Sequence, residues 1–545
     1  MKKIYGLAAM SALLSLASCS TEDPVINSAD NETSGEDQYI AVRIAMPTAT
    51  RALTESFEYG TTPENTINNA TFLLFDSNGN YVGQPTITIT NSDFTHDSST
   101  EDGTAAELTN AVLVINGATS LKSNRLLVVL NDNNSIATTD ATLKANNATI
   151  TDVRRMVVGL ATVTNETTGF VMTNSPYLAD GRLVTGARLT GHIYTTEAEA
   201  KADPMTVYVE RVTSKVRYTE PEAGMVISPE SITFNSVANA DDPDDNGETQ
   251  LTLTPTINGI YLYNRINQSF LSKKAQATWD ASVYDADNYR INWADIPEKE
   301  TDNVTTDTQW NNASWTTLAG SNYAYTSKVA KSFYTLENTD QEHKTGMIIA
   351  ATLKNEDDEA VDFVKFAGLY MTPERYINRI VSNVNEKGYR KSLNGEDQLF
   401  TAADFAFATQ TQHTNAVNAS TIHAYKTFLV CSPATGSGTV AADKLAEINN
   451  MLKEALYTCQ YWNQGKCYYF VEIENSAVED FQYGVIRNNV YEIEIQGIRG
   501  LGTPVPHPGE EITPEKPSDS DETRYVAAKI SVNSWRVVKQ PVTFE

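Results

Sequence analysis

Hydrophobic and polar residues alternate in short stretches along most of the chain, and stretches rich in Asn, Asp, Gly and Thr separate them. Alternation with a period of two is typical of strands that bury one face, so the pattern predicts many short strands. The clearest examples are 71–75, 205–212, 215–218, 468–473 and 490–495. The continuous apolar run 125–130 predicts a buried core strand, and Asn78-Gly79 predicts a hairpin after 71–75.

Helical periodicity is confined to a few places. Thr372-Pro373 could open a helix that ends near Gly388, and apolar stripes at 445–456 and 153–160 predict two others. Roughly 490 residues follow the leader described below, which is too many for one core. The pattern therefore predicts a mainly β fold with two β-sandwich domains, 52–204 and 205–502, and few short helices.

The N-terminus carries an export signal. Lys2 and Lys3 precede an apolar run that is too short to span a bilayer, and Leu16-Ala17-Ser18-Cys19 forms a lipobox. We expect residues 1–19 to be a lipoprotein signal whose Cys19 carries the lipid. The alternative is an ordinary cleaved signal with a coincidental cysteine. Residues 20–37 are acidic and polar, which predicts a disordered tether.

A short alternating segment at 39–46 follows the tether. Ile40, Val42, Ile44 and Met46 share one face, and Arg43 belongs to the other, which we expect to face solvent. A stretch of small polar residues then surrounds Arg51. Cleavage between Arg51 and Ala52 by a trypsin-like protease would remove the lipid anchor and this strand together, so residues 20–51 are interpreted as a propeptide.

The C-terminal end has an architecture of its own. Residues 503–524 are rich in proline and acid, which predicts an extended, semi-rigid linker. Two strand-like pieces follow at 525–532 and 535–544. In the second, Val538, Val542 and Phe544 share a face and Trp535 and Val537 lie opposite. Such a tail could pair outside its own domain, and an ordinary final strand closing its own sheet is the alternative for the first piece.

The charge of the chain narrows the range of its binding partners, and its cysteines limit the disulfides that it could form. The formal net charge of −28 excludes nucleic acid as a natural partner, because phosphate binding requires clustered Lys and Arg. Three cysteines besides Cys19 leave at least one thiol unpaired; Cys459 and Cys467 could bridge a hairpin, or all three could be buried free thiols.

Chemistry-bearing motifs are scarce. The six histidines have no metal-ligand spacing, and neither a nucleophile elbow nor a phosphate loop occurs. Asp242, Asp244 and Asn246 match the first half of a calcium loop, but Leu253 stands where a Glu is needed, so a solvated acidic turn is the alternative. The six tryptophans could stack on sugars, although they follow no platform spacing. These observations indicate a protein that is not an enzyme and needs no cofactor.

Several stretches resemble one family. Residues 483–493, 498–504 and 530–537 closely resemble the C-terminal domain of Mfa-type fimbrillins, the shaft subunits of the type V pili (minor fimbria) of Gram-negative anaerobes, and 207–211 and 270–274 are also similar. The resemblance is specific over 483–545 and weak within 52–200. It implies two Greek-key, transthyretin-like sandwiches, with the lipobox, first strand and Arg51-Ala52 junction at the family's positions.

The resemblance also implies a mechanism. Such subunits reach the outer membrane as lipoproteins, are cut by an Arg-specific surface protease, and polymerise when the C-terminal tail of one copy fills the groove left by the first strand of another. The expected partners are further copies, anchor and tip pilins, and membrane lipid before cleavage; the expected donor residues are Trp535, Val537, Val538, Val542 and Phe544. The alternatives are a tip or anchor pilin, or a glycan-binding surface lipoprotein.

Overall fold

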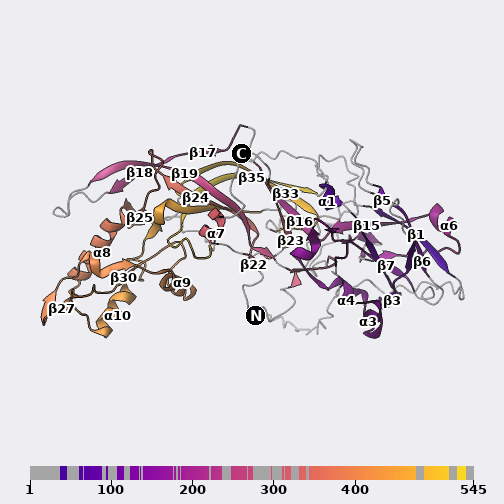
Figure 1. The fold of residues 1–545 in the computed structure, drawn as a ribbon, viewed down its shortest axis with the longest axis horizontal. Coiled ribbons are helices and arrows are strands. Elements are labelled where there is room, and N and C mark those ends of the chain that lie inside the picture. Colours follow the sequence, from indigo (N-terminus) through magenta and orange to yellow (C-terminus); the bar gives the residue numbers. More distant parts are fainter. Residues whose placement is uncertain are drawn as a thin grey trace, which may run out of the picture.

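A computed structural model gives the fold of this chain (Figure 1). It describes residues 37–45, 60–65, 67–88, 94–95, 107–115, 123–133, 136, 139–175, 177–179, 182–184, 186–219, 223–235, 247–266, 268–273, 296–297, 310–311, 314–320, 331–338, 340, 343–473, 484–512, 514 and 524–534. Within these residues the fold is mainly β with several sheets and a few short helices, which confirms the mainly β character predicted from alternation.

The N-terminal part, at the right of Figure 1, is built around a ten-stranded sheet with the order β3-β2-β7-β11-β15-β1-β6-β4, with β14 on β7 and β5 on β6. Its strands are β1 (Gln38–Ala45), β2 (Ala70–Phe75), β3 (Tyr81–Gly83), β4 (Thr86–Thr88), β5 (Phe94–Thr95), β6 (Glu107–Ile115), β7 (Arg125–Leu130), β11 (Met172–Asn174), β14 (Ala187–Arg188) and β15 (Met205–Arg211). One hydrophobic core draws side chains from β1, β2, β6, β7 and β15.

Two features of this sheet follow directly from the sequence. All six residues of β7 are buried, as its continuous apolar run predicts, because one face packs in the core shared with β1 and the other packs under helices α3 and α4. The hairpin between β2 and β3 turns at Gly79, whose φ of +83° only glycine adopts easily.

The C-terminal part contains two sheets that share one core. An eight-stranded sheet has the order β31-β25-β26-β18-β19-β24-β32-β34, and a five-stranded sheet has the order β17-β33-β16-β23 with β35 on β33. The bounds are β16 (Thr213–Thr219), β17 (Val226–Ile227), β18 (Glu230–Asn235), β19 (Glu248–Tyr263), β23 (Lys331–Leu336), β24 (Gly346–Lys354), β25 (Phe363–Phe366), β26 (Leu369–Met371), β31 (Gln460–Trp462), β32 (Lys466–Glu472), β33 (Asn489–Gly500), β34 (Thr503–Pro504) and β35 (Arg524–Ser534).

Short two-stranded ribbons complete the β structure. They pair β8 (Val157–Gly159) with β21 (Gln268–Phe270), β9 (Thr164–Asn165) with β10 (Gly169–Phe170), β12 (Tyr177–Ala179) with β13 (Arg182–Val184), β20 (Arg265–Ile266) with β22 (Trp310–Asn311), β27 (Lys391–Leu393) with β28 (Glu396–Gln398), and β29 (Phe405–Phe407) with β30 (Leu429–Cys431). The β8–β21 ribbon joins the two parts, because β8 precedes β15 of the N-terminal sheet and β21 follows β19 of the eight-stranded sheet.

The helices are short. They are α1 (Thr62–Asn65), α3 (Asp140–Ala145), α4 (Ile150–Arg154), α5 (Leu160–Val163), α6 (Glu197–Ala202), α7 (Trp315–Gly320), α8 (Pro373–Glu386), α9 (Gln410–Asn418) and α10 (Ala442–Met451), with 3-10 turns at Ala402–Asp404 and Asn463–Gly465. Helix α8 begins where Thr372-Pro373 predicts: the Thr372 hydroxyl accepts the Arg375 N–H at its N-terminus, and Tyr376, Ile380, Val381 and Val384 are buried. Helix α10 ends earlier than the apolar stripe suggests, and Leu456 is exposed.

Candidate functional site

Strand β1 lies inside the N-terminal sheet with a neighbour on each side (Figure 1). It runs parallel to β15, with Val42 opposite Met205 and Ala45 opposite Tyr208. It runs antiparallel to β6, with Gln38 opposite Ile115. We call the space that β1 occupies between β15 and β6 the β1 slot.

One face of β1 packs into the core of this sheet. The side chains of Ile40, Val42 and Ile44 are 0%, 0% and 2% exposed, and they join the cluster that includes Leu113 and Val207. Complete burial of an aliphatic side chain of this size contributes about 1.5–3 kcal/mol. Three such side chains and two ladders hold β1 firmly in place.

The second face of β1 is covered as well, contrary to the expectation that it faces solvent. Ala41 is 1% exposed because helix α6 packs over it, and it clusters with Ala200 and Val112. Arg43, two residues further along the same face, is half-buried rather than exposed. The expectation was wrong because a short helix with no helical apolar periodicity supplies the cover.

The segment that carries α6 is tied to β1 by its backbone. Tyr39 N donates to Tyr194 O at 2.8 Å, and Tyr194 N donates to Tyr39 O at 2.9 Å. The Tyr194 hydroxyl donates to Asp203 Oδ2 at 2.5 Å, just beyond the end of the helix. Thr196 caps the start of α6 by accepting the Glu199 N–H. Residues 194–203 therefore form a strap across the outer face of β1.

A buried cluster of charged residues, which we call the joint, anchors helix α1, the first helix after β1. Glu64 in α1 is fully buried and pairs with Lys215 Nζ at 3.0 Å, and the Tyr334 hydroxyl donates to it at 2.5 Å. Burial alone would raise the pKa of Glu64, but the Lys215 ammonium and the bonded hydroxyl lower it below its usual value. The Arg211 Nε donates to the Glu64 carbonyl at 3.1 Å. This joint fixes α1 where β15 leads into β16.

Two further buried ion pairs are present, and the one between Lys273 and Glu210 links the C-terminal part to β15 of the N-terminal sheet. Arg487 Nε lies 3.0 Å from Glu337 Oε2, and the same guanidinium donates to the carbonyls of Phe270 and Leu271. Lys273 Nζ lies 3.0 Å from Glu210 Oε2, with both side chains buried. These contacts involve the 270–274 and 483–493 stretches on which the family resemblance rests.

The C-terminal linker is shorter than its composition suggests. Residues 503–512 pack against the eight-stranded sheet: β34 pairs with β32, and Val505 and Ile512 are 6% and 4% exposed. The expectation of an extended linker from residue 503 is therefore wrong for this part, because its apolar residues find a surface to bury against. Residue 514 is also described, and 513 and 515–523 lie outside the described residues.

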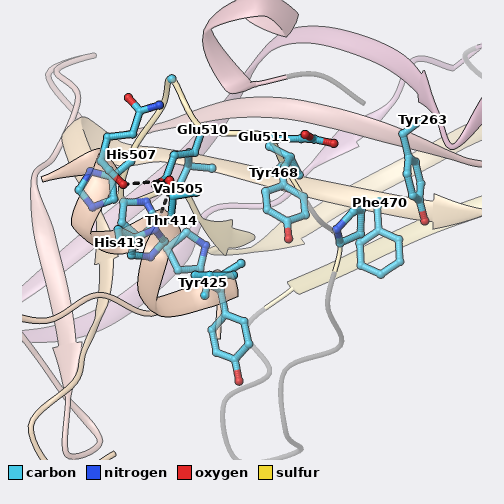
Figure 2. A pocket seen from close by; sticks show the side chains of 18 of the residues that line it. Tyr263, His413, Thr414, Tyr425, Tyr468, Phe470, Val505, His507, Glu510 and Glu511 are labelled. Atoms are coloured by element: carbon cyan, nitrogen blue, oxygen red, sulfur yellow. Dashed lines mark hydrogen bonds and ion pairs between the residues drawn. The ribbon is translucent and has the colours of Figure 1, made fainter. Parts of the chain in front are cut away.

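Figure 2 shows how this segment is held beside a cavity of about 950 Å³. His413 Nδ1 and Glu510 Oε2 are 2.5 Å apart, and the Thr414 hydroxyl donates to Glu510 Oε1 at 2.5 Å. The rings of His413 and His507 lie 4.7 Å apart, and burial lowers the pKa of His507 to about 4. Sequence reasoning missed this pair because the two histidines are far apart along the chain.

Several predicted site residues lie outside the described residues. They are Cys19, Met46, Arg51, Ala52, the calcium candidates Asp242, Asp244 and Asn246, and the tail residues Trp535, Val537, Val538, Val542 and Phe544. The first C-terminal piece is described: β35 pairs antiparallel with β33 from Arg524 to Ser534, so it closes its own sheet in this structure.

Burial also decides between the alternatives for the cysteines and excludes Trp462 as a sugar-stacking residue. Cys431, Cys459 and Cys467 are free and buried, so Cys459 and Cys467 form no bridge, and burial raises the pKa of both thiols. Trp462 is 0% exposed and stacks on Phe363, which leaves it no surface for a sugar.

Among the described residues no group of three or more His, Cys, Asp or Glu could hold a metal ion. No described helix has the length and hydropathy to cross a membrane.

Comparison with known proteins finds two family models in the chain. A model of the major fimbrial subunit protein FimA matches residues 39–215, and one of the C-terminal region of fimbrillin, the type IV major fimbrial subunit protein, matches residues 460–541. The first covers β1, β6, α6 and β15, and the second covers β33 and β35. No curated protein matches the chain.

The solved structures that match this chain are distant from it. A candidate cell adhesion protein from Bacteroides eggerthii is 12% identical, with a TM-score of 0.36 over 93% of this chain and 98% of that one. One from Parabacteroides distasonis is 12% identical, with a TM-score of 0.37 over 92% and 98%. The tip fimbrial protein of Porphyromonas gingivalis, truncated at its C-terminus, is 11% identical, with a TM-score of 0.29 over 92% and 100%.

Proposed function

We propose that this chain, which belongs to the fimbrillin family of fimbrial subunits, is a shaft subunit that polymerises by strand exchange at the β1 slot. The family consists of structural proteins of cell-surface fimbriae and not of enzymes. The proposal therefore concerns how copies of the chain join, and which step makes them able to join.

The precursor is a lipoprotein in this proposal. Cys19 carries the lipid that holds it at the outer membrane, and an Arg-specific surface protease cuts between Arg51 and Ala52. The support is the lipobox, together with the small polar residues around Arg51. Cleavage separates the mature subunit from its anchor and from β1 in one step, and the mature subunit enters an extracellular fibre.

The position of β1 is the observation that carries the proposal. The only covalent connection from β1 to the rest of the subunit body passes through residues 46–59, which contain Arg51. After the cut, β1 stays in the slot by non-covalent contacts alone. Its departure would leave the edges of β15 and β6 unpaired above an apolar core, which is a strong template for an added strand.

The C-terminal region 525–545 of another copy supplies that strand. It follows the docked segment 503–512. We assign the two cores to two sandwich domains and place the boundary after β15 rather than at residue 204, because Met205, Val207 and Val209 lie in the N-terminal core. The contacts of Glu64 with Lys215 and Arg211 join the two domains. Anchor and tip pilins would occupy the ends of such a fibre.

Brief trypsin treatment of the purified precursor tests the proposal. The expected product has Ala52 as its new N-terminus and forms a ladder of heat-resistant oligomers on an unboiled gel. The Arg51→Ala variant should stay monomeric. Predominant cutting at Arg43, or no ladder from chains cut after Arg51, would remove the support for strand exchange.

A further inference from the structure

The chain crosses from the N-terminal sheet to the C-terminal sheet in a segment that is buried throughout. Strand β15 ends at Arg211 and β16 begins at Thr213, so one residue separates the two strands, near the middle of the long axis of the molecule (Figure 1). We call residues 210–215 the crossover. Its residues are polar or charged except for Val212, and none is more than 3% exposed: Glu210, Arg211, Val212, Thr213, Ser214 and Lys215. A segment that joins two domains is ordinarily exposed and flexible, whereas this one is buried.

Charged groups tie both ends of the crossover to other segments of the chain. Glu210 Oε2 lies 3.0 Å from Nζ of Lys273, which follows β21 and is 0% exposed. Lys215 Nζ lies 3.0 Å from Glu64 Oε1, and the Glu64 carbonyl accepts a hydrogen bond from Arg211 Nε at 3.1 Å. The crossover is therefore held by α1 from earlier in the chain and by the segment after β21 from later in the chain.

The two hydroxyl groups of the crossover bond to the C-terminal part. The Thr213 hydroxyl donates to the Thr335 carbonyl in β23 at 2.8 Å, and the Ser214 hydroxyl donates to the Ile486 carbonyl at 2.7 Å. Hydrogen bonds are directional, so few arrangements satisfy a buried network of them, whereas apolar contact is non-directional. Buried ion pairs add little net stability compared with apolar residues of similar size, and their best-attested use is to fix one arrangement. The network therefore specifies how the two domains are placed relative to each other.

Apolar side chains from both parts surround the same segment. Val212 is 0% exposed and belongs to a cluster with Leu127 and Val129 of β7 in the N-terminal sheet. The same cluster contains Leu271, which follows β21, and Leu336 of β23. Domains that share a large hydrophobic interface do not move independently, as domains with a small polar interface do. The crossover thus runs through a core that the two domains share.

We propose that the crossover locks the two domains into one rigid body, so that each subunit acts as a rod and a fibre bends at the contacts between subunits. The shared apolar core supplies the cohesion between the domains. The buried ion pair of Glu210 with Lys273 selects a single angle between them. The statement about the fibre rests on the proposed function, whereas the statement about the single subunit does not.

Scattering and calorimetry of the uncut chain test whether the subunit is a rod. The Arg51→Ala precursor, which should stay monomeric, is heated in a calorimeter and measured by small-angle X-ray scattering. We expect one cooperative unfolding transition, because the shared core couples the domains, and a scattering curve that one rigid conformation fits. Two separate transitions, or a curve that requires several angles between the domains, would overturn the proposal. Failure of the cut chain to polymerise would instead refute the proposed function and leave these measurements unaffected, because they use the uncut chain.

Substitutions in the same precursor test the role of the ion pair. Lys273→Met leaves Glu210 buried without its ammonium partner, so the unfolding midpoint should fall by about 5 °C or more. Glu210→Met together with Lys273→Met removes both charges and should recover much of that loss, yet its scattering curve should require more than one angle between the domains. Lys444→Met with Glu447→Met removes an exposed ion pair and is the matched control, which should change neither measurement.

The double variant at positions 210 and 273 decides the outcome even where Lys273→Met alone fails to fold. A double variant that scatters as one rigid conformation would overturn the role of the ion pair. A double variant that no longer folds would overturn the division of roles, because the shared apolar core would then not supply the cohesion between the domains.

Discussion

Strands β1 and β35 have similar sequences but occupy different positions in their sheets. β1 lies in the interior of the N-terminal sheet, between β15 and β6, and helix α6 covers its outer face. β35 lies beside β33 and is the last described strand of the chain. The comparison shows that local sequence makes a segment a strand, whereas its neighbours decide how firmly it is held.

The difference assigns a separate role to each strand. In the proposed mechanism, two ladders and two covered faces hold β1 in its slot as long as its covalent connection through Arg51 is intact. β35 has one ladder, with β33, and it pairs there with residues such as Tyr491 and Ile493 that belong to the C-terminal core. The two strands therefore depend on contacts in different sheets.

The largest expected effect comes from a charge on the buried face of β1. Val42→Asp places a carboxylate in a fully buried apolar site, which should destabilise the N-terminal sheet by about 4 kcal/mol or more. Arg43→Gln, on the half-buried face, is the control and should cost far less. Chemical denaturation of the precursor measures both. Similar denaturation midpoints for the two variants would show that burial of the core face of β1 does not hold this strand in the sheet.

The sequence predicts the strands of this fold well. β7 is recognised from its apolar run, β1 and β15 from alternation, and α8 from Thr372-Pro373, because each signal arises within a few residues. The parallel pairing of β1 with β15 joins residues more than 160 positions apart, for example Val42 with Met205, and no local pattern specifies it.

The missed parts of the site have a common physical cause. Helix α6 presents Ala200 as its buried side chain, so it has no apolar stripe to recognise. Glutamate is a residue type that is usually exposed to solvent, so the sequence does not predict that Glu64 is buried. Only the structure shows that Lys215 and Tyr334 lie beside it. Residues 503–512 have the composition of a linker, yet Val505 and Ile512 bury themselves. In each case tertiary contacts override a local preference.

An intermediate effect is expected from pH, through the docked segment that precedes β35. Burial keeps the pKa of His507 near 4, with the nearby His413 acting in the same direction and Glu510 opposing. The undocked segment would bind a proton at the ordinary histidine pKa of about 6.5, so docking should weaken as the pH falls from about 6.5 to about 4. Burial alone would raise the pKa of Glu510, but hydrogen bonds from His413 and Thr414 lower it, so its protonation in acid weakens docking too.

Hydrogen exchange of residues 503–512 at pH 7 and pH 4.5 measures this change, after correction for the intrinsic pH dependence of exchange. Protection of these amides from exchange should be lower in acid, and the chain after residue 502 should then extend further from the eight-stranded sheet. His507→Gln removes one of the two titrating groups and should flatten the profile in part. Equal protection at both pH values in the wild-type chain would show that the segment is held by Val505 and Ile512 alone.

The smallest expected effect concerns the strap over β1. Tyr194→Pro removes the N–H that donates to Tyr39 O at 2.9 Å, and one such hydrogen bond contributes about 0.5–1.5 kcal/mol. If this bond is lost before β1 leaves, release of β1 from the cleaved chain should accelerate by about 2–10-fold. Tyr194→Phe removes only the hydroxyl that bonds Asp203 and keeps the bond to Tyr39, so it separates the two contributions. Mass spectrometry of the peptide released over time gives the rate. An unchanged rate of β1 release in Tyr194→Pro would mean that β1 leaves the slot before the strap opens. The contrast between an interior strand and an edge strand would then rest on the ladders with β15 and β6 alone.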